Sequence, residues 1–234
     1  METTSTYLKV LNKIDADIKK LRDQSAAVRW FYENDDPSES YRRALLLEQT
    51  AEKAVLLMRV LPAYTGNPNA ETDIDQIMKE SIPVEIGFTS EGWFSVRIPA
   101  LLPKKAEGSA DYIRSFLYPA MRRFFQKQSP LRYTDCVLVY RHVYDRNRPE
   151  RQKRDHDNIE VNMVSDIVAL YTMPDDAPSV CSHYYCSAEA QTDRTEIYVV
   201  PQNEFPMWLS MESTMPDKGV LLHENRLFEP KKHM

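Results

Sequence analysis

The sequence predicts an α+β fold in which a helical hairpin precedes a small mixed sheet flanked by helices. Up to about residue 64, apolar residues recur at helical spacing with charged residues between them. From residue 82 onward, segments that alternate like strands are interspersed with helical segments. We therefore expect a helical hairpin over 1–64, a linker with a short helix over 65–81, and an α+β domain with a C-terminal extension over 82–234.

The N-terminal part predicts two long antiparallel helices. Residues 5–33 carry apolar side chains at near-heptad spacing. A turn follows at 34–38, where Asp36 or Ser38 can cap a second helix that runs to about Leu61. Two long helices joined by a short turn form a hairpin. Because the leucine pattern spans few heptads, it favours a seam within one hairpin over a coiled-coil dimer.

The rest of the chain mixes strand and helix patterns. A Ser90-Glu91-Gly92 turn separates the first two alternating segments, as in a β-hairpin. We expect strands at 84–88, 93–98, 134–144, 179–187 and 195–200, and helices at about 71–80, 109–127, 158–171 and 205–211.

Composition excludes several classes of protein. The hydrophobic share of 42% and the charged share of 28% are those of an ordinary globular protein. A net charge of −5 means that any contact with DNA must use a local basic patch. With only five glycines, we expect no Gly-rich phosphate loop and no nucleotide cofactor. The apolar runs are too short for a membrane span, and no signal peptide is evident. Three cysteines suit a reducing compartment. We therefore expect a cytoplasmic protein.

One short acidic motif predicts a metal site. Asp155 and Asp157 are two residues apart, so in an extended segment both side chains would point to the same face. The acidic pair Asp175-Asp176 follows about one helix later. Carboxylate oxygens are the ligands that Mg²⁺ and Mn²⁺ prefer. Because the preceding segment 146–154 is basic, we expect this metal site to meet phosphate.

Residues 93–200 resemble the RusA-like Holliday junction resolvases, a family of phage and bacterial endonucleases. The order of the expected elements is similar. The stretch Arg154-Asp155-His156-Asp157-Asn158 matches the Arg-Asp-x-Asp-Asn motif of that family. Asp176 follows Asp157 at a separation typical of the family.

The resemblance implies a RusA-like domain that acts as a homodimer. It also implies a structure-selective endonuclease that cuts branched DNA in recombination and repair. Cleavage would depend on Mg²⁺, with Mn²⁺ as the other candidate ion. It implies that Asp155, Asp157 and Asp176 are the catalytic metal ligands. Glu160, one helical turn after Asp157, and Asp175 are further candidate ligands. The residues expected to hold DNA phosphates are Lys104, Lys105, Arg148, Arg151, Lys153 and Arg154.

Two other interpretations stay open for this motif. Asp157 and Glu160 also fit a capping box, with Asp157 as the N-cap of the following helix. The resolvases usually carry a lysine four residues after the second aspartate, and here that position is Val161. This departure favours an alternative function, a non-catalytic DNA- or protein-binding scaffold on a RusA-like fold. A third hypothesis is a hairpin interaction protein whose α+β domain is structural.

The segment 181–186 contains Cys181, His183 and Cys186, which suggests zinc. The spacing is weak and no second Cys/His pair lies nearby. Alternation within a strand is the better prediction for these residues.

Overall fold

The computed structural model describes residues 2–150, 153 and 156–226. The chain divides into two compact units, Met1–Ile77 and Met78–Met234. This division falls inside the segment 65–81 that the sequence predicts as a linker. The fold class is α+β, as predicted, with six α-helices and one five-stranded mixed sheet in the described part of the chain.

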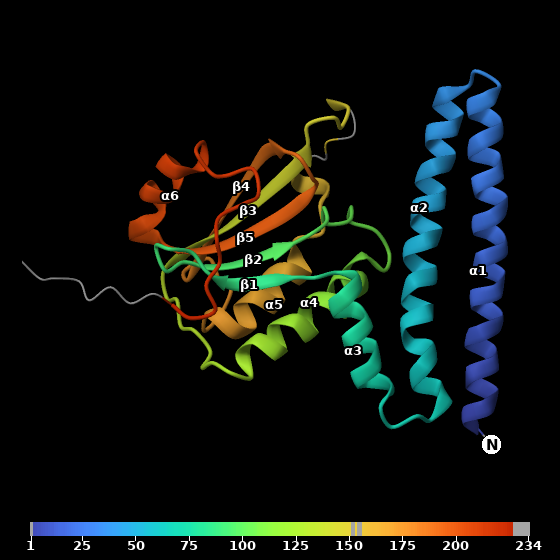
Figure 1. Cartoon of the computed structure of the whole chain (residues 1–234), viewed down its shortest axis with the longest axis horizontal. Helices are drawn as coiled ribbons and strands as arrows, with labels where there is room; N and C mark the ends of the chain where they lie inside the picture. The colour runs from blue at the N-terminus through green and yellow to red at the C-terminus, as the bar shows by residue number, and fades with distance from the viewer. Residues whose placement is uncertain (1, 151–152, 154–155, 227–234) are drawn as a thin grey trace, which may run out of the picture. The chain divides into compact units, whose positions relative to one another are not determined.

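The N-terminal unit contains the predicted helical hairpin. Helices α1 (Glu2–Glu33) and α2 (Pro37–Val60) run side by side (Figure 1). Of the two candidate caps, Asp36 is the N-cap of α2, because its carboxylate accepts a hydrogen bond from the Glu39 amide at 3.0 Å. The Ser40 hydroxyl donates to the Val28 carbonyl at 3.0 Å and ties the two helices together. Helices α1 and α2 therefore contact each other as a hairpin.

After α2, a short 3₁₀ helix (Leu61–Thr65) leads to α3 (Ala70–Ser81).

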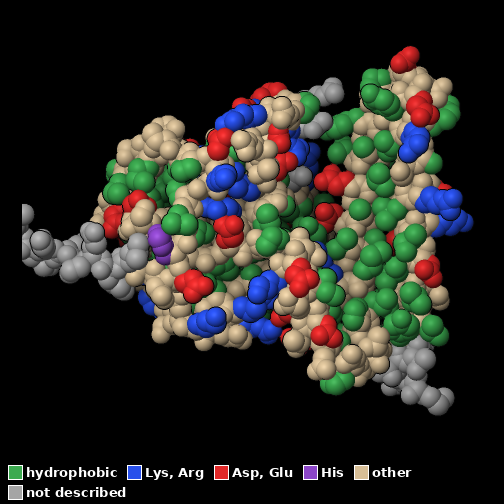
Figure 2. Space-filling view, in the orientation of Figure 1, with side chains coloured by type: hydrophobic (Ala, Val, Ile, Leu, Met, Phe, Trp, Pro, Cys, Tyr) green, Lys and Arg blue, Asp and Glu red, His purple; other side chains and the backbone are tan. Residues whose placement is uncertain are grey.

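The hairpin leaves much apolar surface uncovered. Trp30 and Tyr32 are 57% and 73% exposed. Figure 2 shows hydrophobic side chains over much of the visible face of α1 and α2. The contact between two helices covers only one stripe of each helix, so a hairpin leaves its other apolar side chains exposed.

The C-terminal unit is built on a sheet of order β1-β2-β5-β3-β4. Only β3 and β4 pair in parallel; the other neighbours are antiparallel. All five predicted strands are present: β1 (Glu85–Phe88), β2 (Phe94–Ile98), β3 (Cys136–Asp145), β4 (Cys181–Ala190) and β5 (Arg194–Pro201). Strand β3 is buried along nearly its whole length. Its almost continuous apolar run fits a strand covered on both faces.

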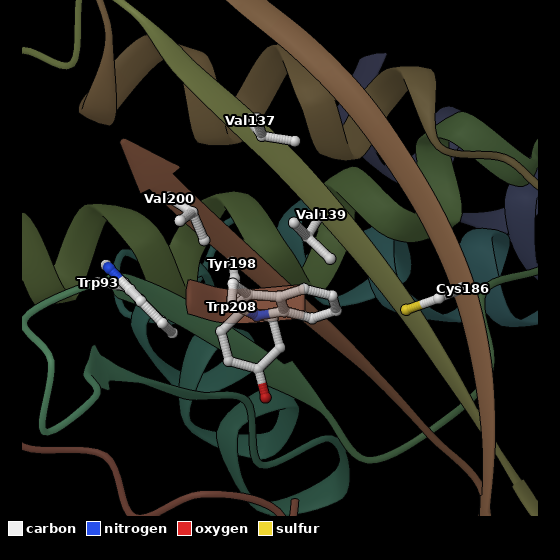
Figure 3. Packing of buried hydrophobic residues seen from close by; sticks show 7 residues of the cluster. All are labelled: Trp93, Val137, Val139, Cys186, Tyr198, Val200 and Trp208. Carbon is white, nitrogen blue, oxygen red and sulfur yellow. The ribbon is translucent and has the colours of Figure 1, made fainter. Parts of the chain in front are cut away.

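Helices cover both faces of this sheet. Helices α4 (Ser109–Phe125) and α5 (Asn162–Thr172) lie on one face, and α6 (Phe205–Glu212) lies on the other (Figure 1). On the α4 and α5 face, the Tyr140 and Ser165 hydroxyls lie 2.6 Å apart and link β3 to α5. On the α6 face, Figure 3 shows a packed apolar cluster of Trp93, Val137, Val139, Cys186, Tyr198, Val200 and Trp208.

The α6 face of the sheet also buries an ionic cluster. The Glu196 carboxylate is fully buried and accepts hydrogen bonds from Arg141 Nη1 at 2.9 Å, Arg194 Nε at 2.6 Å and Tyr198 Oη at 2.8 Å. Burial alone would raise the pKa of Glu196, but the two guanidinium groups and the tyrosine hydroxyl outweigh it and lower that pKa. Two cations share one carboxylate here.

The segment after α6 returns to the sheet edge. His223 pairs with Phe88 of β1 through two backbone hydrogen bonds of 2.8 Å. The approach is close because Gly87 has no side chain: a Cβ there would lie 2.6 Å from the His223 carbonyl oxygen. No helix in the described residues is both long enough and apolar enough to cross a membrane.

Candidate carboxylate site along helix α5

The segment around Asp157 is held by a second loop. His156–Asn158 forms a short 3₁₀ helix. The Lys105 amide then donates to the Asn158 carbonyl at 3.0 Å, and the Glu160 amide donates to the Pro103 carbonyl at 2.9 Å. This pairing places the exposed Lys104 and Lys105 beside the acidic motif. Two of the expected phosphate contacts thus lie next to Asp157, although they come from a loop some fifty residues earlier.

Two expectations for this motif are wrong. Asp157 lies in a 3₁₀ helix rather than in an extended segment. The capping box is also absent, because α5 begins only at Asn162, with Val161 at its N-cap position. The pairing with Pro103–Lys105 holds the intervening residues in a strand-like bridge, so the helix starts later than local sequence suggests. Glu160 instead accepts from the Met163 amide at 3.4 Å and from the Ser109 hydroxyl at 3.3 Å.

A histidine fixes the 3₁₀ helix against strand β4. His156 Nε2 lies 2.9 Å from the Ser187 hydroxyl. The His156 ring stacks on Tyr185 with 6.0 Å between ring centroids, and it lies 5.6 Å from the ring of the buried His142. These contacts give Asp157, which is exposed, a defined position at the β4 edge of the sheet.

The later acidic pair lines a pocket at the other end of α5. Asp175 and Asp176 face a cavity of about 340 Å³ together with Asp166 and Arg132. Burial raises the pKa of Asp166, and the charges of Asp176 and Glu160 raise it further. Folding therefore places Asp166 between two other carboxylates along the exposed side of α5.

Asp166 is a site residue that the sequence reasoning missed. It lies in the expected helix, between the two acidic motifs, four residues after the exposed Asn162 and four before the exposed Leu170. Residues at this spacing share one face of a helix. A helical projection of the segment would have placed Asp166 on the exposed face of the helix.

The predicted ligands do not all come together. Asp157 precedes α5 and Asp176 follows it, and a helix of 11 residues spans roughly 16 Å. Among residues 2–150, 153 and 156–226, no three His, Cys, Asp or Glu side chains are grouped closely enough to hold a metal ion. Asp155, the remaining predicted ligand, lies outside the described residues. The carboxylate chemistry suits Mg²⁺, but the described residues alone do not form a complete ligand set.

The basic loop before the motif is paired with acids of the same unit. Arg148 Nε donates to Asp193 Oδ1 at 3.2 Å, and its second contact to this carboxylate helps to raise the pKa of Arg148. Lys153 Nζ lies 2.6 Å from both Glu150 and Glu189, which raise the pKa of Lys153 to about 12. These cations hold their loop in place, and to bind phosphate they would have to exchange a carboxylate partner. Arg151 and Arg154 lie outside the described residues.

Val161 belongs to the hydrophobic core. It is 5% exposed, and its carbonyl accepts hydrogen bonds from the Ser165 hydroxyl at 3.1 Å and the Tyr140 hydroxyl at 3.4 Å. At the position where the resemblance leads one to expect a lysine, this chain has a packing residue.

Comparison with known proteins finds a matching family model. The model of a family described as "Family of unknown function (DUF6100)" matches residues 2–226. No curated protein and no solved structure matches the chain.

Proposed function

The chain belongs to the DUF6100 family, whose function is unknown, and we propose that its C-terminal unit is a divalent-metal-dependent endonuclease that acts on branched DNA. The observation that carries the proposal is the row of carboxylates along α5, where Asp166 lines one pocket with Asp175 and Asp176. Burial raises the pKa of Asp166, and the charges of Asp176 and Glu160 raise it further. Like charges brought together by folding destabilise the protein unless a cation binds among them. A hard divalent cation with oxygen ligands is the natural counter-ion.

The resemblance to RusA-like resolvases supplies the reaction. The resemblance implies Asp155, Asp157 and Asp176 as ligands, with Glu160 and Asp175 as further carboxylates. Because Asp157 and Asp176 lie at opposite ends of α5, one ion could bind both only if they approached each other. A bound Mg²⁺ would supply an activated water and neutralise charge on the scissile phosphate. The resemblance rests on the order β2, α4, β3, acidic motif, α5, acidic pair and a closing strand, which is β5.

DNA contacts are assigned to the exposed cations nearest the carboxylates. Lys104 and Lys105 are held beside Asp157 by backbone pairing, and Arg132 lines the pocket of Asp176. Such contacts attract the DNA backbone with a salt-dependent affinity that does not depend on sequence. We further propose that the protein acts as a homodimer, with the helical hairpin aiding dimerisation. Its three free cysteines suit the cytoplasm, where we propose that it works.

Cleavage of a synthetic four-way junction tests this proposal. The purified full chain should cut the junction in Mg²⁺ or Mn²⁺, and Asp157→Asn and Asp176→Asn should abolish cutting while the junction is still bound. Asp73→Asn is the control, because it removes an exposed carboxylate in the other unit. If wild type fails to cut at any concentration of either metal ion, the endonuclease proposal is lost.

A non-catalytic DNA- or protein-binding scaffold is the second candidate. The burial of Val161 favours it, because a core valine can neither stabilise transition-state charge nor position water. The same assay separates the two functions. Junction binding without cleavage by wild type, unchanged in Asp176→Asn, would favour the scaffold.

A further inference from the structure

Two free cysteines lie directly opposite each other on neighbouring strands. Cys136 of β3 pairs in register with Cys181 of β4. Neighbouring strands are about 4.8 Å apart, and disulfides join residues whose Cα atoms are roughly 4.4–6.8 Å apart. Directly paired residues project to the same face of a sheet, so the two thiols need little backbone movement to form a bond.

The two sulfur atoms differ in protonation. The Cys136 thiol and the His183 imidazole outweigh burial and lower the pKa of Cys181 well below its usual range. The same thiol–thiolate interaction, with burial, raises the pKa of Cys136. Cys136 Sγ lies 3.6 Å from the Val180 carbonyl oxygen, as suits a protonated thiol. The Ser182 carbonyl oxygen lies 3.4 Å from Cys181 Sγ and favours the protonated thiol there. His183 and Cys136 together outweigh this contact and favour the thiolate form of Cys181. At neutral pH the pair therefore holds a nucleophilic thiolate beside a neutral thiol.

Cys186 provides an internal comparison on the same strand. It is 7% exposed and Cys181 is 6% exposed, so both are equally shielded from solvent. Cys186 faces the α6 side of the sheet, where its register partner is Arg141. Burial and the neighbouring Glu212 raise the pKa of Cys186. It has neither an activating imidazole nor a second thiol opposite it in register.

We propose that Cys136 and Cys181 form a redox-active dithiol that hydroperoxides oxidise to an interstrand disulfide. The Cys181 thiolate attacks the peroxide O–O bond, giving Cys181 sulfenic acid and, after protonation of the leaving oxygen, water or an alcohol. The Cys136 thiol then attacks the sulfenic sulfur; the S–S bond forms, the S–O bond breaks, and water leaves. Each disulfide consumes one hydroperoxide, and the two sulfur atoms together lose two electrons.

The position of the pair suits such chemistry. Strand β4 is an edge of the sheet, so local opening exposes its side chains more readily than those of the central strands. His183, two residues after Cys181 on the same face, is exposed and gives a small oxidant a polar approach. The proposal does not depend on the nuclease proposal, because it concerns the thiols alone.

Peptide mapping of the oxidised full chain tests the proposal. The protein is treated with hydrogen peroxide at neutral pH, remaining thiols are alkylated, and the digest is analysed by mass spectrometry without reduction. We expect a linked peptide joining Cys136 to Cys181, with Cys186 fully alkylated, and reversal by a thiol reductant. If Cys186 is oxidised as fast as Cys181, or if Cys181 is oxidised without linkage to Cys136, the proposal is wrong.

A variant separates the two steps. In Cys136→Ser the resolving thiol is missing, so peroxide should leave Cys181 as a sulfenic acid that dimedone traps. Cys186→Ser is the matched control and should still form the Cys136–Cys181 disulfide at the wild-type rate. If Cys136→Ser fails to fold, peptide mapping of the oxidised wild-type protein still tests the proposal. Cys186 in the same molecule then reports the reactivity of a thiol that is not activated.

Discussion

Replacing Glu196 by glutamine should cost the C-terminal unit much of its stability. Glu196 is fully buried, and it is the shared partner of Arg141 and Arg194, which are each 5% exposed. Glutamine keeps the shape but carries no charge, and its amide NH₂ would face a guanidinium donor. Removing one partner of a buried ion pair typically costs about 3–5 kcal/mol. We expect about 3 kcal/mol, because the remaining amide oxygen still accepts one hydrogen bond.

The effect should depend on pH in a defined direction. The pKa of Glu196 lies below its usual value of 4.5, so its charge contributes stability above that pH. The contribution is lost as pH falls from 4.5 through the lower pKa of the folded state. The difference between Glu196→Gln and wild type should therefore be full at pH 7 and should shrink in acid.

Tryptophan fluorescence during urea unfolding measures this change. The chain has three tryptophans, and a Trp30→Phe background leaves only the buried Trp93 and Trp208, both in the C-terminal unit. The control is Glu189→Gln, because Glu189 is 51% exposed and solvent screens its ion pair with Lys153. Equal free energies of unfolding for the two variants would refute the reasoning.

Three further predictions concern other parts of the chain. Gly87→Ala should push away the His223 carbonyl and lower the free energy of unfolding by about 1–3 kcal/mol. It should also speed proteolysis of the segment after α6, and unchanged proteolysis would contradict the close approach. Asp36→Ala should destabilise the hairpin by about 1 kcal/mol. It should also speed amide hydrogen exchange in the first turn of α2, and unchanged exchange would show that Asp36 is not the cap. Alkylation of Cys181 by iodoacetamide should rise at a pH well below the usual pKa of a thiol, whereas Cys186 should react only in alkali. Parallel profiles would count against a thiolate at Cys181.

Local patterns were enough to predict the elements of the fold. The hairpin follows from helical spacing on both sides of a short turn around Asp36, and β3 follows from the apolar run over 136–140. In both cases the residues that determine the element lie within it. The start of α5 could not be predicted in this way, because the pairing of Pro103–Lys105 with Asn158–Glu160 joins segments far apart in the chain.

The candidate site shows the same limit. Sequence could identify Asp175 and Asp176 as an acidic pair, and the structure adds Asp166 to their pocket. Sequence could not show that Arg148 pairs with Asp193, which lies 45 residues later on the chain. The charge of a residue can be read from sequence, but whether that charge is already neutralised depends on tertiary contacts.

Calorimetric titration with Mn²⁺ tests most directly whether the carboxylates along α5 hold a divalent cation. The account predicts that the full chain binds Mn²⁺, that Asp166→Asn and Asp176→Asn each weaken binding, and that Asp73→Asn binds as wild type does. Asp166→Asn should also remove the charge that Glu160 and Asp176 oppose, so it should not destabilise the metal-free protein. Equal Mn²⁺ affinity in wild type and Asp176→Asn, or no binding by wild type, would contradict the account.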